Sequence, residues 1–198
     1  ISWRLEKNKN KKWSLFLGKE VPTHVLPSII KAFPIAHLYL EKCCNNTLSK
    51  ILEECYDDLD LELLSFKEVI FSTSQQELFS KVFQSNSNLL SLCFTSCKNL
   101  LSSSLEVALT HTPKLRSLNL TLPSDPIEIL NLLKKKSANL KELHLFFSLK
   151  TPRSLLRSEE FQFLSNCQSL QKLTLIRAPL SPKLLKAITK ISSLQELD

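Results

Sequence analysis

The chain contains a single glycine, Gly18, and no methionine among its 198 residues. Phosphate-binding loops and dinucleotide-binding fingerprints require several glycines in a short stretch, and neither motif is present in the sequence. No apolar run in these residues is long enough to cross a bilayer as a helix. The sequence therefore offers no support for nucleotide binding or for a membrane span, and we expect no membrane association.

Histidine is also scarce, with four residues in the chain. They are scattered, and none forms an acid-base pattern with an obvious nucleophile. Serine is plentiful, but no serine stands in a nucleophile-elbow motif. We therefore expect a protein that is not an enzyme, uses no cofactor and has no evident small-molecule substrate.

Leucine is abundant, and it recurs at a regular spacing. Leu115, Leu118 and Leu120 form a Leu-x-x-Leu-x-Leu unit. Related units start 24 to 30 residues apart, at Ile35, Leu61, Leu89, Leu140, Leu170 and Leu194. The last two apolar positions of each unit alternate with polar ones, which is typical of a strand with one buried side. A fixed period of this length indicates stacked repeats.

Apolar residues with helical spacing lie between these strands. Asn46 and Thr47, Ser74, and Ser124 to Pro126 stand where helices would start. The residues from Val25 to Phe33 are predicted to form the helix of an earlier repeat, with its strand near residues 13–17. The other predicted helices cover about 48–52, 78–83, 105–109, 127–133, 155–164 and 184–188. Connections of this length favour parallel strands joined by right-handed crossovers, and hence an α/β fold.

The stretch from Ile35 to Cys43 resembles the cysteine-containing, ribonuclease-inhibitor-like leucine-rich repeat. Leu89 to Cys97 matches the same pattern, including the cysteine at the ninth position. The resemblance implies a right-handed β-α solenoid with a curved parallel sheet on the concave side and helices on the convex side. It also implies that residues 1–198 are a single leucine-rich repeat domain fragment of about seven repeats. We expect this fragment to be truncated at both ends.

Repeats that resemble these usually bind other proteins. In the cysteine-containing subtype they often form the substrate-recognition part of F-box proteins, which recruit targets to a ubiquitin ligase. The resemblance therefore implies a non-catalytic protein–protein interaction scaffold, with an F-box-type ubiquitin ligase adaptor as the first candidate. An innate-immune or other sensor repeat domain and a regulator of small GTPases are the alternatives.

The repeat offsets predict which strand residues point away from the helices. The sheet should display aromatic or charged groups in its outer repeats and small polar groups in its middle repeats. Tyr39 and Phe146 are the strongest candidates for contact with a protein partner, because binding hot spots favour aromatic residues and arginine. The other interpretation is that these residues are merely tolerated on the strands. The candidate partner-binding residues are His37, Tyr39, Cys93, Asn119, His144, Phe146, Lys172, Thr174 and Arg177.

The formal net charge of +7 is unevenly distributed. Residues 1–20 carry +4, residues 21–100 carry −3 and residues 101–198 carry +6. Lys134, Lys135 and Lys136 lie at the predicted end of a helix, where positive charge complements the helix dipole. Lys7 to Lys12 are predicted to lie in a loop. Because no aromatic residues are interleaved with the basic ones, we do not expect nucleic acid binding.

The chain has six cysteines, and Cys93 and Cys97 have no second cysteine or histidine pair with the spacing of a zinc site. Cys43 and Cys97 are predicted to be buried where the chain leaves a strand, and Cys93 to lie on the displayed face. Free thiols suit a reducing compartment, so we expect a cytoplasmic or nuclear, intracellular protein. Two glycosylation sequons, at Asn45 and Asn119, would favour an extracellular protein, but Asn119 falls within a predicted strand.

Overall fold

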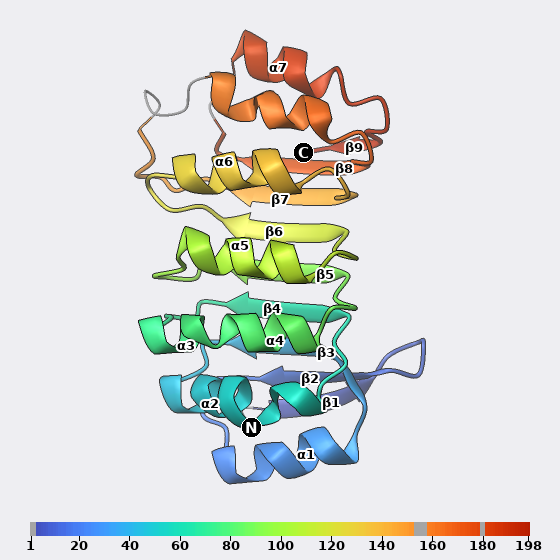
Figure 1. The fold of residues 1–198 in the computed structure, drawn as a ribbon, viewed down its shortest axis with the longest axis vertical. Coiled ribbons are helices and arrows are strands. Elements are labelled where there is room, and N and C mark those ends of the chain that lie inside the picture. The colour runs from blue at the N-terminus through green and yellow to red at the C-terminus, as the bar shows by residue number, and fades with distance from the viewer. Residues whose placement is uncertain (1–2, 153–157, 179–180) are drawn as a thin grey trace. The chain divides into compact units, whose positions relative to one another are not determined.

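The structure is a computed structural model that describes residues 3–152, 158–178 and 181–198. The chain divides into two compact units, Ile1–Lys114 (unit 1) and Leu115–Asp198 (unit 2). In each unit, most strands are separated along the sequence by helical segments (Figure 1). The predicted α/β class, with parallel strands, is confirmed.

The described part of unit 1 has five strands that pair in sequence order. They are β1 (Trp3–Lys7), β2 (Trp13–Leu17), β3 (Ile35–Glu41), β4 (Leu63–Lys67) and β5 (Ser91–Thr95). The β1–β2 pair is antiparallel and the other pairs are parallel. The α-helices are α1 (Leu26–Ala32), α2 (Asn45–Lys50), α3 (Thr73–Glu77), α4 (Phe79–Ser85) and α5 (Ser102–His111). The shorter helical segments are the 3-10 helices η1 (Thr23–Val25) and η3 (Tyr56–Asp58) and the π-helical η2 (Ile51–Cys55).

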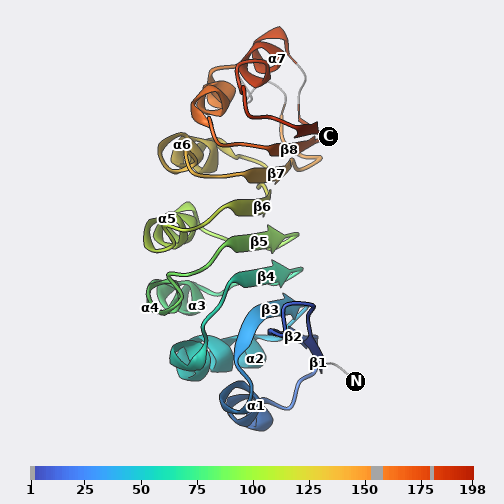
Figure 2. The same ribbon diagram turned by 90° about the vertical axis from the view of Figure 1, so that its right-hand side faces the viewer.

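Unit 2 repeats the same alternation. Its strands are β6 (Ser117–Thr121), β7 (Glu142–Phe146), β8 (Lys172–Ile176) and β9 (Glu196–Leu197), and neighbours in sequence pair in parallel. Its helices are α6 (Ile127–Lys136), the 3-10 helix η5 (Ser158–Asn166) and α7 (Pro182–Ile188). In each unit the helices lie on one side of the strands, which leaves the other side as an outward face (Figure 2).

The inward positions of the strands form the core that the repeat pattern predicts. In unit 1, Leu38, Leu64 and Leu92 pair across β3, β4 and β5, and each is at most 2% exposed. The equivalent row in unit 2 is fully buried and consists of Leu118, Leu143 and Leu173. Because a shift of one residue would turn every side chain to the other face, this register also fixes the outward residues.

Aromatic rings join the sheet of unit 1 to its helices. The Phe79 ring of α4 lies 5.4 Å from that of Phe71 and 5.5 Å from that of Phe83, measured between ring centroids. Phe66 of β4 stacks on Phe94 of β5 at 5.1 Å. All five rings are buried. Pairs of this kind contribute beyond the area that they bury, so this cluster is a large part of the core of unit 1.

Two details of the predicted elements were wrong. Lys7, which we expected in a loop, is the last residue of β1, a strand that the repeat pattern did not predict. The N-cap of α3 is Ser72 rather than Ser74, because the Ser72 hydroxyl accepts the backbone N–H of Gln75 while the Gln75 side chain accepts the backbone N–H of Ser72. This reciprocal capping box satisfies two amides at the helix start.

The remaining predicted helices and strands match the structure to different degrees. The strand expected near residues 13–17 and the helix expected from Val25 to Phe33 are confirmed as β2 and α1. The helix expected at 48–52 begins earlier, after Cys44 as its N-cap, and continues into η2. Leu155 and Leu156, which we expected in the helix at 155–164, lie outside the described residues, and the described part of that segment is η5.

Candidate functional site

The outward face of unit 1 is formed by alternate residues of neighbouring strands. Tyr39 of β3 pairs with Ser65 of β4, and Ser65 pairs with Cys93 of β5. All three side chains are half-buried, whereas the strand residues on either side of them are buried. The predicted positions of Tyr39 and Cys93 on this face are confirmed, and His37 occupies the adjacent outward position on β3.

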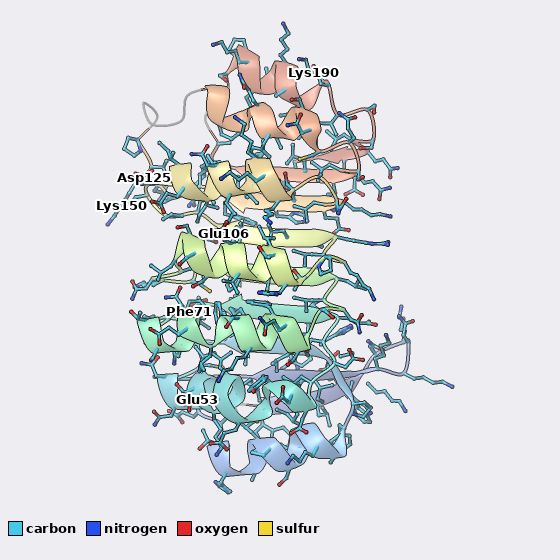
Figure 3. All side chains as sticks on the ribbon, viewed as in Figure 1. Glu53, Phe71, Glu106, Asp125, Lys150 and Lys190 are labelled. Carbon is cyan, nitrogen blue, oxygen red and sulfur yellow. The ribbon has the colours of Figure 1, made fainter. Side chains whose placement is uncertain are left out.

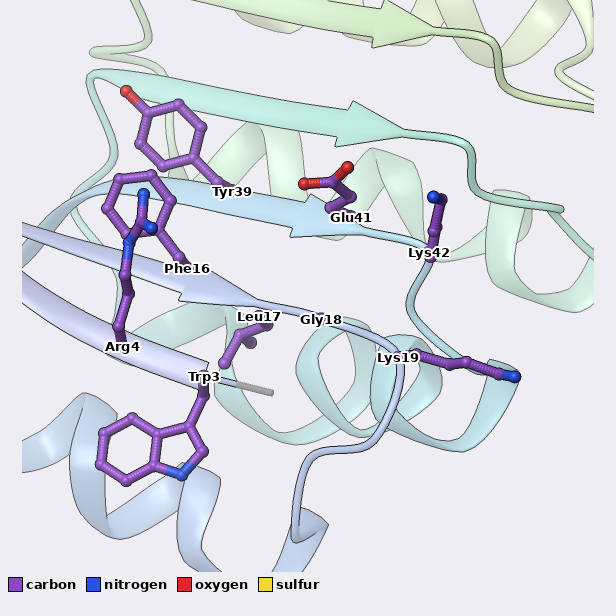
Figure 4. Close-up of a pocket in the computed structure, with 9 residues that line it drawn as sticks. All are labelled: Trp3, Arg4, Phe16, Leu17, Gly18, Lys19, Tyr39, Glu41 and Lys42. Atoms are coloured by element: carbon purple, nitrogen blue, oxygen red, sulfur yellow. The ribbon is translucent and has the colours of Figure 1, made fainter. Parts of the chain in front are cut away.

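Three side chains from three strands stack at one end of this face (Figure 4). The Phe16 ring of β2 lies parallel to the Tyr39 ring, with centroids 4.4 Å apart and an interplanar angle of 5°. The guanidinium carbon of Arg4, from β1, lies 4.1 Å from the centre of the Phe16 ring. Strand pairing places Arg4 opposite Phe16, and Phe16 opposite Tyr39. A cation over an aromatic face is attractive, so Arg4 helps to hold the two rings in place.

A depression of about 330 Å³ adjoins this stack, and it combines apolar and charged walls. The rings of Phe16 and Tyr39 supply apolar surface, and Lys19, Glu41 and Lys42 supply charge. The remaining lining residues are Trp3, Arg4, Leu17 and Gly18. Burial, and secondarily the charge of Glu6, raises the pKa of Tyr39, so its hydroxyl remains protonated and can donate a hydrogen bond.

Ion pairs cross the strands beside the depression. Lys67 of β4 donates to Glu41 of β3 at 2.9 Å, and this hydrogen bond lowers the pKa of Glu41 and raises that of Lys67. Lys42 lies 3.4 Å from Glu68, each directly after its strand. These groups are exposed, so the pairs add little to stability. Their main effect is to fix the positions of charges next to the aromatic stack.

His37 is bonded to the β1–β2 hairpin. Its Nδ1 atom lies 3.1 Å from the Ser14 hydroxyl and 3.4 Å from the Asn8 side-chain amide, which donates to it. Burial lowers the pKa of His37, and the nearby charge of Lys12 acts in the same direction against that of Glu62. The ring is therefore neutral near pH 7, and Nδ1 can accept. The side chain is half-buried and ties the hairpin to β3.

Six of the nine predicted site residues belong to unit 2. Asn119, His144 and Thr174 form one outward row across β6, β7 and β8, and Nδ1 of His144 lies 2.9 Å from the Thr174 hydroxyl. Burial is the main reason that the pKa of His144 is lowered. Phe146 is half-buried at the end of β7. Lys172, at the start of β8, forms an ion pair with Glu196 of β9.

Two of these residues are not exposed side chains at outward strand positions. Thr174 is only 6% exposed, so it is largely withdrawn from contact despite its outward position. Arg177 lies one residue beyond β8, in a left-handed backbone conformation with φ of 63°, and is exposed. Arg177 thus belongs to the turn at the end of the strand. The remaining candidates occupy outward strand positions, His37, Tyr39 and Cys93 in unit 1 and Asn119, His144, Phe146 and Lys172 in unit 2.

The ninth-position cysteines share one hydrogen-bonding pattern. The Cys43 thiol donates to the carbonyl of Leu17 at 3.2 Å, and the Cys97 thiol donates to that of Phe66 at 3.4 Å. In both cases the acceptor is the last core residue of the preceding strand. Burial raises the pKa of Cys43 to about 12 and that of Cys97 to about 11. Cys43 is buried as predicted, whereas Cys97 is only half-buried. Both thiols therefore have a structural role, in which each bonds the turn after its strand to the preceding strand.

Arg4 and Phe16 are the site residues that the sequence reasoning missed. The signal that could have found them is the alternation of Trp3 and Leu5 with polar residues, followed by the asparagine-containing turn at 8–12. That pattern describes a hairpin, but it does not contain the leucine unit on which the repeat predictions depended. Without β1 there was no reason to place a guanidinium on this face.

In the described part of the chain, no group of three or more His, Cys, Asp or Glu side chains could hold a metal ion. Among the same residues, no helix has the length and apolar character needed to cross a membrane. The chain matches no protein-family model, and no curated protein matches it.

Proposed function

We propose that this chain is a leucine-rich repeat domain that binds a protein partner through the outward face of its strands. The observation that carries this proposal is the stack of Arg4, Phe16 and Tyr39 beside a depression on that face. Half-buried aromatic rings held by a guanidinium offer a large contact area with little loss of side-chain freedom on binding. The fixed charges of Glu41 and Lys67 next to the rings provide the polar rim that protein interfaces have.

The regularity of the repeats supports the leucine-rich repeat assignment. Each repeat contributes a parallel strand and, after it, a helical segment, and corresponding core residues pair with each other. The two ninth-position thiols occupy the same place and bond to equivalent carbonyls. We propose that the repeats stack as a right-handed β-α solenoid whose strands form the binding side. The narrower role, substrate recognition for a ubiquitin ligase, stays a prediction.

Site-specific photo-crosslinking tests the proposed face. A benzoylphenylalanine at position 39 should cross-link a discrete protein partner from cells that express the chain. The matched control is the same group at position 56, because Tyr56 is the other tyrosine of the chain and lies in η3, in the helical layer. A partner that cross-links at position 39 and not at 56 supports the proposal.

Alanine variants make the same test without a reactive group. The partner identified by cross-linking is detected with an antibody against it after pull-down with the unmodified chain. The double variant Tyr39→Ala with Phe16→Ala should no longer recover this partner, whereas Tyr56→Ala should recover it. Circular dichroism must show that both variants remain folded. Equal recovery of the partner by the parent chain and both variants would exclude the outward face of unit 1 as the binding surface. Identical cross-links at positions 39 and 56 would exclude it as well.

A further inference from the structure

Almost all of the net positive charge of the chain lies in unit 2. Residues 115–198 contain 13 Lys and Arg against 7 Asp and Glu, a net charge of +6, whereas residues 1–114 contain 13 against 12, a net charge of +1. The two units have the same alternation of strands and helices. The charge difference therefore is not a requirement of the fold.

The positive charge of unit 2 is concentrated where its helices end and its strands begin. The segments that join a helix to the next strand are 115–116, 134–141, 164–171 and 186–195. None of them contains Asp or Glu, and all but 164–171 contain Lys or Arg, while Glu142 and Glu196 are the first residues of the strands that follow. Figure 3 shows Lys190 on the opposite side of unit 2 from Asp125 and Lys150. We call this surface the basic edge. Its basic residues are Arg116, Lys134, Lys135, Lys136, Lys141, Lys186 and Lys190.

Main-chain hydrogen bonds hold the strand side of the basic edge together. The carbonyl of Arg116 accepts the N–H of Lys141 at 2.7 Å, and the carbonyl of Lys141 accepts the N–H of Gln171 at 2.7 Å. Gln171 in turn accepts from Gln195 at 2.8 Å. Two cations and two amides thus occupy neighbouring positions on a rigid row. The last turn of α6, with its three consecutive lysines, leads into this row.

The cations of the basic edge are not neutralised by the described residues. None of the seven has a described carboxylate within 4.0 Å, and the ion pair of the described part of unit 2 is Lys172–Glu196. The lysines of unit 1 are different, since five of them are in ion pairs: Lys12–Glu62, Lys31–Asp58, Lys42–Glu68, Lys50–Glu54 and Lys67–Glu41. The connection from helix to β4 in unit 1 is even acidic, with Asp57, Asp58, Asp60 and Glu62.

The helix dipole accounts for only part of this arrangement. The end of a helix carries the equivalent of about half a negative charge, which is less than the charge of Lys134, Lys135 and Lys136 together. Arg116 and Lys141 lie outside any helix, directly before β6 and β7. A surplus of positive charge remains at the basic edge, and it would attract an anionic partner.

We propose that the basic edge binds an acidic polypeptide segment. Six of its seven cations are lysines, whose mobile point charges can pair with carboxylates without a fixed bidentate geometry. The segments of the basic edge contain no Phe, Tyr or Trp on which the bases of a single strand could stack. This surface is separate from the aromatic stack of unit 1, so the proposal is independent of the function proposed above.

Fluorescence anisotropy with the full chain tests this proposal. The probe is a labelled 20-residue peptide rich in glutamate, and its competitors are a 20-base-pair DNA duplex and a single strand of the same length. Lys136→Gln with Lys141→Gln should weaken peptide binding roughly fivefold or more, as expected for the loss of two exposed ion pairs. Lys150→Gln with Lys183→Gln changes the net charge equally, away from the basic edge, and should weaken binding less than about twofold.

Three outcomes would overturn the proposal. Equal weakening by the two pairs of substitutions would mean that only net charge matters. Tighter binding of either DNA than of the peptide at equal salt would identify a nucleic acid as the better partner. Absence of peptide binding at low salt would show that the edge binds no acidic segment. Unfolding midpoints of both variants, matched to the parent, ensure that the comparison concerns folded protein.

Discussion

Adjacent residues of a single strand contribute very differently to stability, and β6 offers a direct comparison. Leu118 is fully buried, while its neighbour Asn119 is half-buried on the outward face. Leu118→Ala should lower the free energy of unfolding by about 2 to 5 kcal/mol, because a cavity replaces the side chain. Asn119→Ala should change it by less than about 1 kcal/mol. Denaturant titration measures both values, and equal losses would show that the register is wrong.

The cysteines should differ in reactivity according to their surroundings. Cys44 is exposed, and hydrogen bonds from the Thr47 side chain and backbone lower its pKa, whereas burial raises the pKa of its neighbour Cys43 to about 12. Since only the thiolate reacts with iodoacetamide, Cys44 should be alkylated first at pH 8. On lowering the pH from 9 to 7, Cys44 should also lose reactivity less steeply than a free cysteine in a peptide.

Peptide mapping by mass spectrometry follows this alkylation residue by residue. Cys97, with a pKa of about 11, provides a second slow site in the same sample. Alkylation of Cys43 as fast as that of Cys44 in the folded protein would contradict the buried hydrogen bond to Leu17. Both thiols should react rapidly in urea, where burial no longer protects Cys43.

At the level of elements, most strands can be predicted from the sequence because their leucines mark the buried positions. Leu64 and Leu92 alternate with outward residues. Alternation of apolar and polar residues indicates a strand with one buried side, most clearly when the same pattern recurs at a fixed spacing along the chain. β1 escaped prediction because its apolar residues, Trp3 and Leu5, do not belong to that repeat. Helix starts were less certain, because several polar residues near each start can act as the cap.

The start of α3 tests the choice between two such residues. Ser72 forms the capping box with Gln75, whereas Ser74, the cap that the sequence suggested, only approaches the Ser72 hydroxyl at 3.0 Å. Ser72→Ala should cost about 0.5 to 2 kcal/mol of unfolding free energy. Ser74→Ala should cost less than about 0.5 kcal/mol, as an ordinary surface change. Thermal and denaturant unfolding of the two variants decide between them, and the reverse order would refute the observed cap.

At the level of the whole molecule, the candidate site depends on the strand pairing within unit 1 as well as on the repeat pattern. Tyr39 could be assigned from its offset within one repeat. Its place in a stack that includes Arg4 could not, because Arg4 comes from β1, which pairs antiparallel with β2 and has no counterpart in the repeat. The basic edge escaped notice for a related reason. Its charges are dispersed in sequence, and only the strand pairing shows that Arg116 and Lys141 are neighbours.

In the proposed solenoid each repeat is packed mainly by its neighbours, so stability should be similarly local. In the described part of the chain, the rings that Phe79 contacts all belong to unit 1, and Phe163 is a fully buried ring of unit 2. Phe79→Ala should cost about 3 to 5 kcal/mol. It should reduce hydrogen-exchange protection in β4 and β5 more than in β7 and β8. Phe163→Ala is the reciprocal control and should affect β7 and β8 more.

Hydrogen exchange measured by mass spectrometry distinguishes local opening of each unit from unfolding of the whole chain as one block. In a chain that unfolds as one block, either substitution would lower protection in all of these strands by the same amount, because every amide would exchange through the same opening. Opposite patterns for the two variants require that the units open separately. In that case a partner bound at the aromatic stack would protect β2 and β3 strongly and β8 weakly, since binding raises only the opening free energy of the unit that it contacts.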